Sequence, residues 1–323
     1  MALTKSFLSF AVALVASTVS ASALAAEALK IGMVLPLSGP YASYGQQIER
    51  GARVYLKQHE GQIAGRQVEL VLKDDTGVSA DASKRAAQEL LSTHKVDILA
   101  GFGLTPSAMA VAPLATAARK PMIVMNAAAS KVTTQSNYIV RVSQTMSQVT
   151  APLATWSAMN RVRKVFTLVS DYGPGHDAET EFKRTFKALG GEIVGDARVP
   201  VGQLDFAKLL PRIKASQADA VFLFVPPGEQ TVAFTKAFAQ AGLDKAGVRI
   251  IATGDLTEEG SLDAMGDSAL GLITAHHYAE SHQSAENKAY VQAYTQAYPT
   301  SRHNYMSVAG YDGLQLIAKV LAK

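Results

Sequence analysis

Apolar runs that alternate with amphipathic stretches constrain the fold of this chain more than any other feature. A buried strand is predicted at residues 29–37 and is followed by a helical pattern at 46–59. The order then repeats, with strands predicted at 68–73, 96–101 and 122–125 and helices at 81–93 and 107–119. Strand and helix alternation with short connections is typical of a parallel sheet covered by helices on both faces.

The same pattern restarts near residue 150, which predicts a second lobe. Helices are expected at 151–160, 176–189, 206–215, 229–241, 285–298 and 306–321, and strands at 165–169, 192–199, 220–225, 248–252 and 270–274. We therefore predict an α/β fold of two Rossmann-like lobes, hinged around a central cleft, with parallel sheets flanked by helices. Residues 26–145 and 277–323 would form lobe 1, and residues 146–276 would form lobe 2. Ligands of such sheets bind beyond the carboxyl ends of the strands, where the two lobes face each other.

The first 25 residues have the pattern of a cleavable export signal. Lys5 provides a basic start, residues 7–15 are largely apolar, and Ala23 and Ala25 provide the small residues of a cleavage site. The apolar run is much shorter than the ~20 residues that a bilayer span needs. We expect cleavage after Ala25 and a periplasmic location, with no later segment apolar for long enough to cross a membrane.

Composition excludes several other classes of protein. The chain has no cysteine, so neither disulfides nor an N-terminal lipid-anchored cysteine is available. Its formal net charge is only +4 and the basic residues are scattered, which argues against nucleic-acid binding. The 323 residues, 48% of them hydrophobic, are enough for one large or two medium domains. We expect a monomer.

Several motifs, taken in order, resemble one family. They are SGPYASYG after the first strand, Asp74-Asp75, PMIVMNAAAS, YIVRVS with Arg141, SDYGPG, and YDGLQLIAK near the end. Together they are similar to the periplasmic solute-binding proteins of ABC importers, in the leucine/isoleucine/valine-binding branch with the type I fold. The resemblance implies a receptor that traps a small solute between two lobes and delivers it to a permease in the inner membrane, without enzymatic activity. Members of the family usually continue for several tens of residues beyond the YDGLQLIAK helix, whereas this chain ends at Lys323, so a C-terminally short second lobe or a truncated sequence is expected.

The first lobe offers candidate ligand contacts in the loop before the 107–119 helix. Thr105 and Ser107 lie at a helix N-terminus, where unpaired backbone N–H groups suit a carboxylate. An ordinary helix cap with Pro106 in the first turn would explain the same residues. The resemblance further implies an aromatic contact from Tyr44, in the loop after the first strand. An exposed loop tyrosine is the alternative for Tyr44.

The resemblance also implies contacts from both lobes at other strand ends. Ala128 and Ser130 match the segment that supplies backbone groups and a hydroxyl to a carboxylate, and small residues that merely allow tight packing are the alternative. Tyr172 matches the aromatic side chain of the second lobe that closes over the ligand. Asp255 falls where amino-acid-binding members pair with an ammonium group, although it could simply cap the following helix.

Two departures from the family leave the ligand open between an amino acid and another acid. Pro226-Pro227 stands in place of a further aromatic residue of the second lobe, and the 103–107 loop is altered. Our first expectation is a small carboxylate-bearing ligand, such as a branched-chain or other hydrophobic amino acid. Aromatic acids or amides are the alternative, and a ligand sensor that signals to a partner is another. A gene for a permease or an ATPase beside this one would separate transport from sensing.

Enzyme, cofactor and metal sites find little support. Gly101-Phe102-Gly103 lacks the third glycine of a dinucleotide loop, so no cofactor is expected. A doubly wound enzyme would need a phosphate loop or a nucleophile elbow after the first strand, and neither is present. Ser170, Asp171 and His176 show no third group that would orient a base. His276 and His277 are expected to face opposite sides of a strand as hinge or surface residues, so no metal site is predicted.

Overall fold

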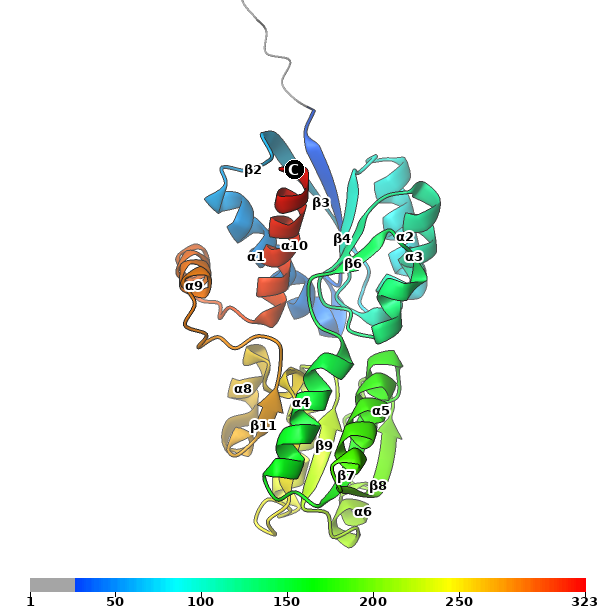
Figure 1. Ribbon diagram of the computed structural model, residues 1–323, viewed down its shortest axis with the longest axis vertical. Coiled ribbons are helices and arrows are strands. Elements are labelled where there is room, and N and C mark those ends of the chain that lie inside the picture. Colours follow the sequence, from blue (N-terminus) through cyan, green and yellow to red (C-terminus); the bar gives the residue numbers. More distant parts are fainter. Residues whose placement is uncertain (1–26) are drawn as a thin grey trace, which may run out of the picture.

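The computed structural model describes residues 27–323, which form two α/β lobes stacked along the long axis of the molecule (Figure 1). The two-lobed α/β architecture predicted from the sequence is confirmed. The predicted export signal at residues 1–25 lies outside the described residues. Within the described part, no helix is both long and apolar enough to span a membrane.

The sheet of lobe 1 has six strands in the order β2-β3-β1-β4-β5-β6. Their bounds are Leu29–Leu35 for β1, Gln62–Ile63 for β2, Arg66–Asp74 for β3, Ile98–Gly101 for β4, Met122–Val124 for β5 and Ile139–Arg141 for β6. All neighbouring strands pair in parallel except β2, which forms an antiparallel hairpin with β3. The carboxyl ends of β1, β4 and β5 therefore meet at one edge of the sheet.

Helices cover both faces of this sheet because the side chains of its strands alternate between two cores. Ile31, Met33 and Leu35 of β1 pack toward α1 (Ala42–Gln58) and α10 (Tyr305–Leu321). Val34 points the other way, toward α2 (Ala80–Ser92) and α3 (Thr105–Ala118). The helix α9 (Ala285–Ala297) packs its buried Tyr290 and Tyr294 near Val54 of α1. Short 3-10 turns lie at Gly39–Tyr41 (η1) and Ser130–Gln135 (η2).

Glycines let α1 and α10 approach to backbone contact. A Cβ atom on Gly51 would lie 1.7 Å from the carbonyl oxygen of Ser307, and one on Gly310 would lie 2.0 Å from that of Ile48. No side chain fits at either position. This contact holds the last helix of the chain against the first helix of lobe 1, as Figure 1 shows.

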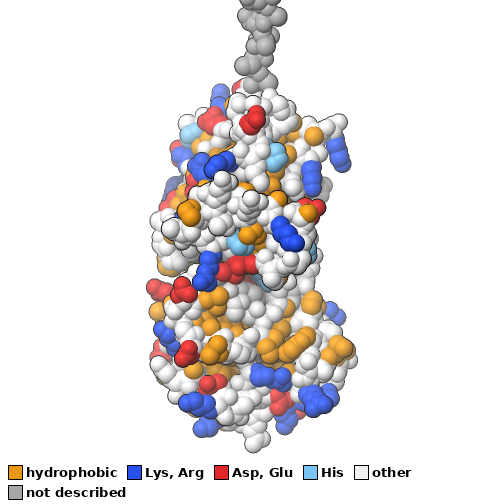
Figure 2. Space-filling view, turned by 90° about the vertical axis from the view of Figure 1, so that its left-hand side faces the viewer, with side chains coloured by type: hydrophobic (Ala, Val, Ile, Leu, Met, Phe, Trp, Pro, Cys, Tyr) orange, Lys and Arg blue, Asp and Glu red, His pale blue; other side chains and the backbone are white. Residues whose placement is uncertain are grey.

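Lobe 2 has a five-stranded sheet in the order β11-β10-β9-β7-β8, parallel throughout. Its strands are β7 (Lys164–Ser170), β8 (Glu192–Val199), β9 (Ala220–Phe224), β10 (Arg249–Thr253) and β11 (Ile273–Ala275). Its helices are α4 (Met146–Met159), α5 (Gly173–Ala188), α6 (Leu210–Ala215), α7 (Glu229–Gln240) and α8 (Glu259–Met265), with 3-10 turns η3 (Gly254–Thr257) and η4 (Gly266–Ala269). One core lies under α4 and α5 and the other under α6 and α7. Apolar side chains gather on the surface of this lobe on the face shown in Figure 2, and Leu270 is 79% exposed.

The chain passes between the two sheets at residues 142–145 and 276–284. A capping box at Thr145, completed by Gln148, starts α4 directly after the first crossing. The predicted boundaries between the lobes, after residue 145 and after residue 276, stay predictions, because they concern which residues move together.

Several element bounds differ from the sequence prediction for local reasons. The first helix begins at Ala42 rather than residue 46, because η1 with Pro40 leads straight into it. The helix predicted from residue 151 begins at Met146 because of the capping box. The helix predicted from 206 begins at Leu210, since the Asp205 carboxylate accepts a hydrogen bond from the N–H of Ala207 and holds a turn there. The edge strand β6 was not predicted, because its three residues are too few to show an alternating hydrophobic pattern.

Candidate ligand-binding site

A cavity lies between the carboxyl ends of the two parallel sheets. The space in it that a water-sized sphere can enter is about 20 Å³, which is room for about one water molecule. Lobe 1 lines it with Tyr44, Gly103, Leu104, Thr105, Asn126, Ala127 and Ala128. Lobe 2 and the crossing at 142–145 line it with Gln144, Met146, Tyr172, Pro174, Phe224, Pro226, Pro227 and Asp255. Because both lobes line this space, a ligand held there would contact both lobes, and the lining residues would have to move apart to admit it.

Five of the seven residues predicted to bind the ligand line this cavity together: Tyr44, Thr105, Ala128, Tyr172 and Asp255. They come together because each follows the end of a parallel strand, β1, β4, β5, β7 or β10. Tyr44 lies in α1, 3% exposed, and not in an exposed loop. Their contact with a ligand stays a prediction.

Ser107 and Ser130 do not line the cavity. The fully buried hydroxyl of Ser107 donates to Oδ2 of Asp75 at 2.6 Å, and that carboxylate also accepts from the N–H of Gly77 at 2.9 Å. The predicted ligand hydroxyl of Ser107 is therefore engaged in joining α3 to the loop after β3. Ser130 instead donates its backbone N–H to Oδ2 of Asp177, in α5 of lobe 2, at 2.7 Å.

The N-termini of α3 and α5 face each other across the cleft. Neither N-cap residue, Leu104 or Tyr172, makes a side-chain hydrogen bond to its helix. A Cβ atom on Gly173 would lie 3.6 Å from Cγ2 of Thr105, so the two helix starts nearly touch. Within residues 27–323, the backbone N–H groups of Thr105 and Gly173 donate no hydrogen bond. Two positive helix ends converge here, which favours a bound anion.

Arg141 fixes the orientation of a further N–H group in the cavity lining, that of Ala128. Its guanidinium donates to the carbonyl oxygens of Ala127 at 2.8 Å and Ala129 at 2.9 Å. The carbonyl of Ala127 and the N–H of Ala128 belong to one trans peptide unit and point in opposite directions. The N–H of Ala128 therefore points away from Arg141, and no described residue accepts a hydrogen bond from it.

Aromatic rings and prolines form the walls. The ring of Tyr44 packs edge-on against Tyr41 with centroids 5.3 Å apart, and the ring of Tyr172 stacks on Phe224 at 6.0 Å. The hydroxyl of Tyr44 donates to the carbonyl oxygen of Pro227 at 3.1 Å, which is a direct hydrogen bond between the lobes. Burial raises the pKa of Tyr44 and of Tyr172 well above the ordinary value, so both remain neutral hydroxyl groups.

Asp255 is the single ionisable carboxyl group of the cavity lining. Its Oδ2 accepts from the hydroxyl of Thr253 at 2.6 Å and its Oδ1 from the hydroxyl of Tyr305 at 3.2 Å. Burial raises its pKa above the usual range, against the lowering effect of these hydroxyl groups. Asp255 lies in η3 and does not cap α8, whose N-cap residue is Glu258. The alternative that Asp255 serves as a helix cap is therefore wrong.

The side chains considered for catalysis do not assemble. Nε2 of His176 lies 2.6 Å from Oδ1 of Asp171, but the hydroxyl of Ser170 lies 3.3 Å from Oε1 of Gln230. A nucleophile, its base and an orienting acid would have to form one chain of hydrogen bonds. The hydroxyl of Ser170 is hydrogen-bonded to Gln230 and not to His176, so this chain is not formed.

The prediction that His276 and His277 face opposite sides of a strand was wrong. The strand β11 ends at Ala275, so strand alternation does not reach them, and their ring centroids lie only 4.6 Å apart. His276 is half-buried rather than at the surface, with its ring 4.2 Å from that of Tyr305. Burial lowers the pKa of His276 to about 4.

The sequence interpretation missed Asn126, Gln144, Met146, Phe224 and Tyr305. Asn126 lies two residues after the end of β5 and two before the predicted Ala128, so its position at a strand end could have indicated it. Tyr305 could not be found, because it belongs to α10 of lobe 1 and reaches Asp255 of lobe 2. Gln144 lies in a polar connection without any motif.

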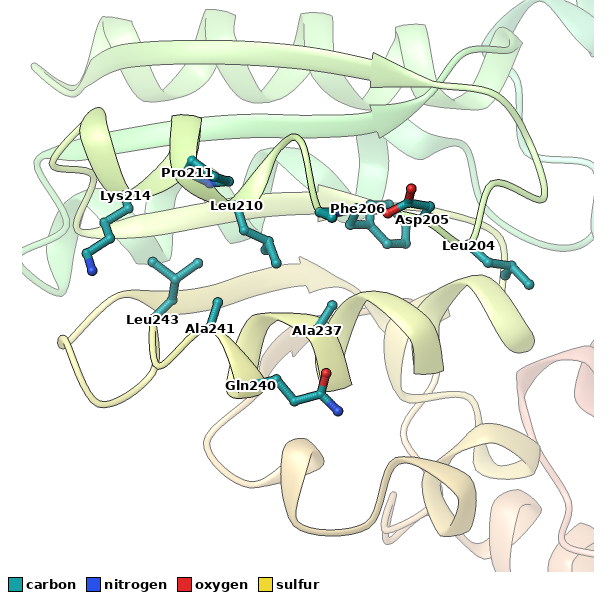
Figure 3. A pocket seen from close by; sticks show the side chains of 11 residues that line it. Leu204, Asp205, Phe206, Leu210, Pro211, Lys214, Ala237, Gln240, Ala241 and Leu243 are labelled. Atoms are coloured by element: carbon teal, nitrogen blue, oxygen red, sulfur yellow. Dashed lines mark hydrogen bonds between the residues drawn. The ribbon is translucent and has the colours of Figure 1, made fainter.

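A larger hollow on lobe 2 is a different kind of feature. A water-sized sphere can enter about 530 Å³ of it, and it lies between residues 204–214 and the end of α7, where Leu210, Ala237 and Leu243 face one another (Figure 3). All its lining residues belong to lobe 2. Because both walls come from one lobe, movement of the lobes would not enclose a ligand there, whereas it would in the cavity between them.

Two doubly wound lobes with a cavity lined by both of them at their facing strand ends define a two-lobed solute-binding protein. The chain belongs to the periplasmic binding protein family, whose model matches residues 28–323. This confirms the resemblance found in the sequence.

Relatives from several bacteria match along most of the chain. Leu/Ile/Val-binding protein homolog 6 of Brucella melitensis biotype 1 is 41% identical over 310 residues, which cover 96% of this chain and 80% of that protein. A solute-binding protein of an ABC transporter from Rhodopseudomonas palustris BisB5, solved with 3,4-dihydroxybenzoic acid, is 46% identical with a TM-score of 0.86, covering 91% of this chain and 80% of that one. Another from R. palustris, solved with 4-hydroxybenzoate, is 43% identical with a TM-score of 0.88, covering 91% and 80%.

Proposed function

We propose that this protein captures a small aromatic carboxylic acid of the hydroxybenzoate type in the cavity between its lobes and delivers it to the permease of an ABC importer. The observation that carries the proposal is a small cavity with aromatic walls and a cluster of unpaired N–H groups. The N–H groups of Thr105, Ala128 and Gly173 are the proposed carboxylate site. The aromatic ring would lie between Tyr44 and Tyr172.

The state of Asp255 favours an acid without an amine. An ammonium group in a closed cleft needs an ionised carboxylate partner, because a buried unpaired charge is costly. Both oxygens of Asp255 already accept hydroxyl groups, and burial raises its pKa. The two R. palustris proteins that match this chain at 43% and 46% identity were solved with hydroxylated benzoates, which supports the same class.

A hydrophobic amino acid is the second candidate. The specific observation in its favour is Asp255 itself, which lies in the cavity lining at the position expected for an ammonium partner. The name of the Brucella relative points the same way. In this case Asp255 would be ionised and bound to the ligand's amine.

A thermal-shift screen separates the two candidates. The purified chain is heated with benzoate, 4-hydroxybenzoate, 3,4-dihydroxybenzoate, leucine, isoleucine or valine. A ligand present at 100 times its Kd stabilises the folded state by about 2.7 kcal/mol, which shifts the midpoint by several degrees. We expect this shift with the hydroxybenzoates and none with the amino acids. Stabilisation by leucine alone would refute the proposal.

We further propose that the receptor acts as a monomer in the periplasm after removal of residues 1–25, and that it catalyses no reaction. Mass spectrometry of the exported protein should find an N-terminus at Ala26. A strain that lacks this gene should take up labelled 4-hydroxybenzoate more slowly than its parent. Normal uptake in the deletion strain would argue against a role in import and for a role in sensing.

A further inference from the structure

The wall of the cavity contains a buried amide, the side chain of Gln144, whose oxygen has no hydrogen-bond partner among the described residues. It lies at the crossing between the lobes, after β6 and immediately before the cap of α4. Gln144 is 3% exposed, and its Oε1 is fully buried with no hydrogen bond to any described residue. A buried polar atom left unpaired is destabilising, so this position calls for a partner from outside the protein.

The other buried polar side chains of the lining, those of Tyr44, Thr105, Asn126 and Asp255, each make at least one hydrogen bond. The hydroxyl of Tyr44 donates to Pro227, and that of Thr105 accepts from the N–H of Ala129 at 3.3 Å. The amide of Asn126 donates to the carbonyl oxygen of Gly103 at 2.8 Å, and Asp255 accepts two hydroxyl groups. Gln144 thus differs from these neighbours because its buried oxygen makes no hydrogen bond to any described residue.

The chemistry of an amide limits which ligand group can satisfy it. Oε1 needs a hydrogen-bond donor, and the carboxylate of an aromatic acid has none. A ring hydroxyl both donates and accepts, so it pairs with the amide in either of its two orientations. The carboxylate has its own proposed site at the N–H groups of α3 and α5.

We propose that Gln144 is a specificity-determining residue that hydrogen bonds a ring hydroxyl of the bound acid and so selects hydroxylated benzoates over benzoate. This inference rests on the proposed function, since it presupposes an aromatic acid in the cavity. A site built to bond a hydroxyl discriminates strongly against the analogue that lacks it, because the protein's polar group is then left buried and unpaired.

Calorimetric titration of the full chain with benzoate, 3-hydroxybenzoate and 4-hydroxybenzoate tests the proposal. We expect the wild type to bind one of the two hydroxybenzoates at least about tenfold more tightly than benzoate. In Gln144→Met or Gln144→Leu this preference should fall to less than about threefold, with benzoate affinity unchanged or higher. The matched control is Ser143→Ala, which removes a neighbouring buried and unpartnered hydroxyl that does not line the cavity. It should keep the wild-type preference.

A ligand pair provides an independent test on the wild type, should neither Gln144 variant fold. The two ligands are benzoates that differ in one substituent, placed at the ring position of the preferred hydroxyl. One carries an amino group, which can donate a hydrogen bond, and the other carries a methyl group of similar size, which cannot. The aminobenzoate should bind more tightly than the methylbenzoate. Equal binding of the pair, or an equal loss of both benzoate and hydroxybenzoate in Gln144→Met, would overturn the assignment of Gln144. Failure of the wild type to bind any of these acids would instead refute the proposed function, and this inference with it.

Discussion

The hydrogen bond between Ser130 and Asp177 predicts a variant that weakens closure of the lobes without touching the ligand. The N–H of Ser130 in lobe 1 donates to Oδ2 of Asp177 in lobe 2 at 2.7 Å, and neither residue lines the cavity. The short distance and the negative acceptor make this a charge-assisted bond. Such bonds contribute about 1.5–3 kcal/mol. Asp177→Ala should therefore lower the ratio of closed to open forms by about 10- to 150-fold.

Binding then weakens because only the closed form makes contacts from both lobes. The apparent Kd rises in inverse proportion to the fraction of binding-competent protein, so it can increase by up to the same factor. Titration calorimetry with 4-hydroxybenzoate measures the Kd, and small-angle scattering of the ligand-free variant should show a larger radius of gyration.

The matched control removes a carboxylate from the same end of α5 but within one lobe. Asp171 pairs with His176, and both belong to lobe 2. Asp171→Ala should leave the Kd and the scattering close to those of the wild type. The reasoning is refuted if Asp177→Ala binds as tightly as the wild type, or if both variants lose affinity equally.

Three further predictions concern the acid, the packing and the pH. Asp255→Asn should weaken 4-hydroxybenzoate binding by less than about tenfold in calorimetry, since no ligand amine loses a charged partner; a 1,000-fold loss would indicate an ammonium ligand. Gly51→Ala should lower the free energy of unfolding in urea by about 3 kcal/mol or more, because the new Cβ would lie 1.7 Å from a backbone oxygen of α10. Its control, Arg53→Ala at an exposed position of the same helix, should have little effect. Burial lowers the pKa of His276 to about 4, so between about pH 6.5 and pH 4 the unfolded chain binds a proton at this histidine that the folded protein does not. The free energy of unfolding should therefore be highest above about pH 6.5 and fall by up to about 3 kcal/mol toward pH 4. His276→Gln should show a smaller fall, and an equal fall in both proteins would contradict this cause.

The sequence was enough to predict most of the order of elements and about a third of the residues that line the cleft. Period-2 and period-3.6 patterns locate strands and helices, and parallel strands carry their carboxyl ends to one edge. Thr105, Ala128, Tyr172 and Asp255 therefore meet without any knowledge of side-chain contacts. Family resemblance added which of these strand ends to consider.

The remaining features depend on long-range contacts that no local pattern records. Ser107 reads as a helix-start residue with a free hydroxyl, yet Asp75, 32 positions away, accepts a hydrogen bond from it. Gln144 reads as an ordinary polar connection, and only its burial without a partner distinguishes it. His276 and His277 were misjudged because the strand was assumed to include both of them, whereas β11 ends at Ala275. In each case tertiary packing decides the role of a residue whose type is uninformative.

A crystal structure of the protein with 4-hydroxybenzoate tests the central claim most directly. We predict one acid per chain in the cavity between the lobes, with its ring between Tyr44 and Tyr172 and its carboxylate at the N–H groups of Thr105 and Ala128. An acid bound only in the hollow beside α7, or one whose carboxylate points toward Asp255 instead of α3, would contradict the account.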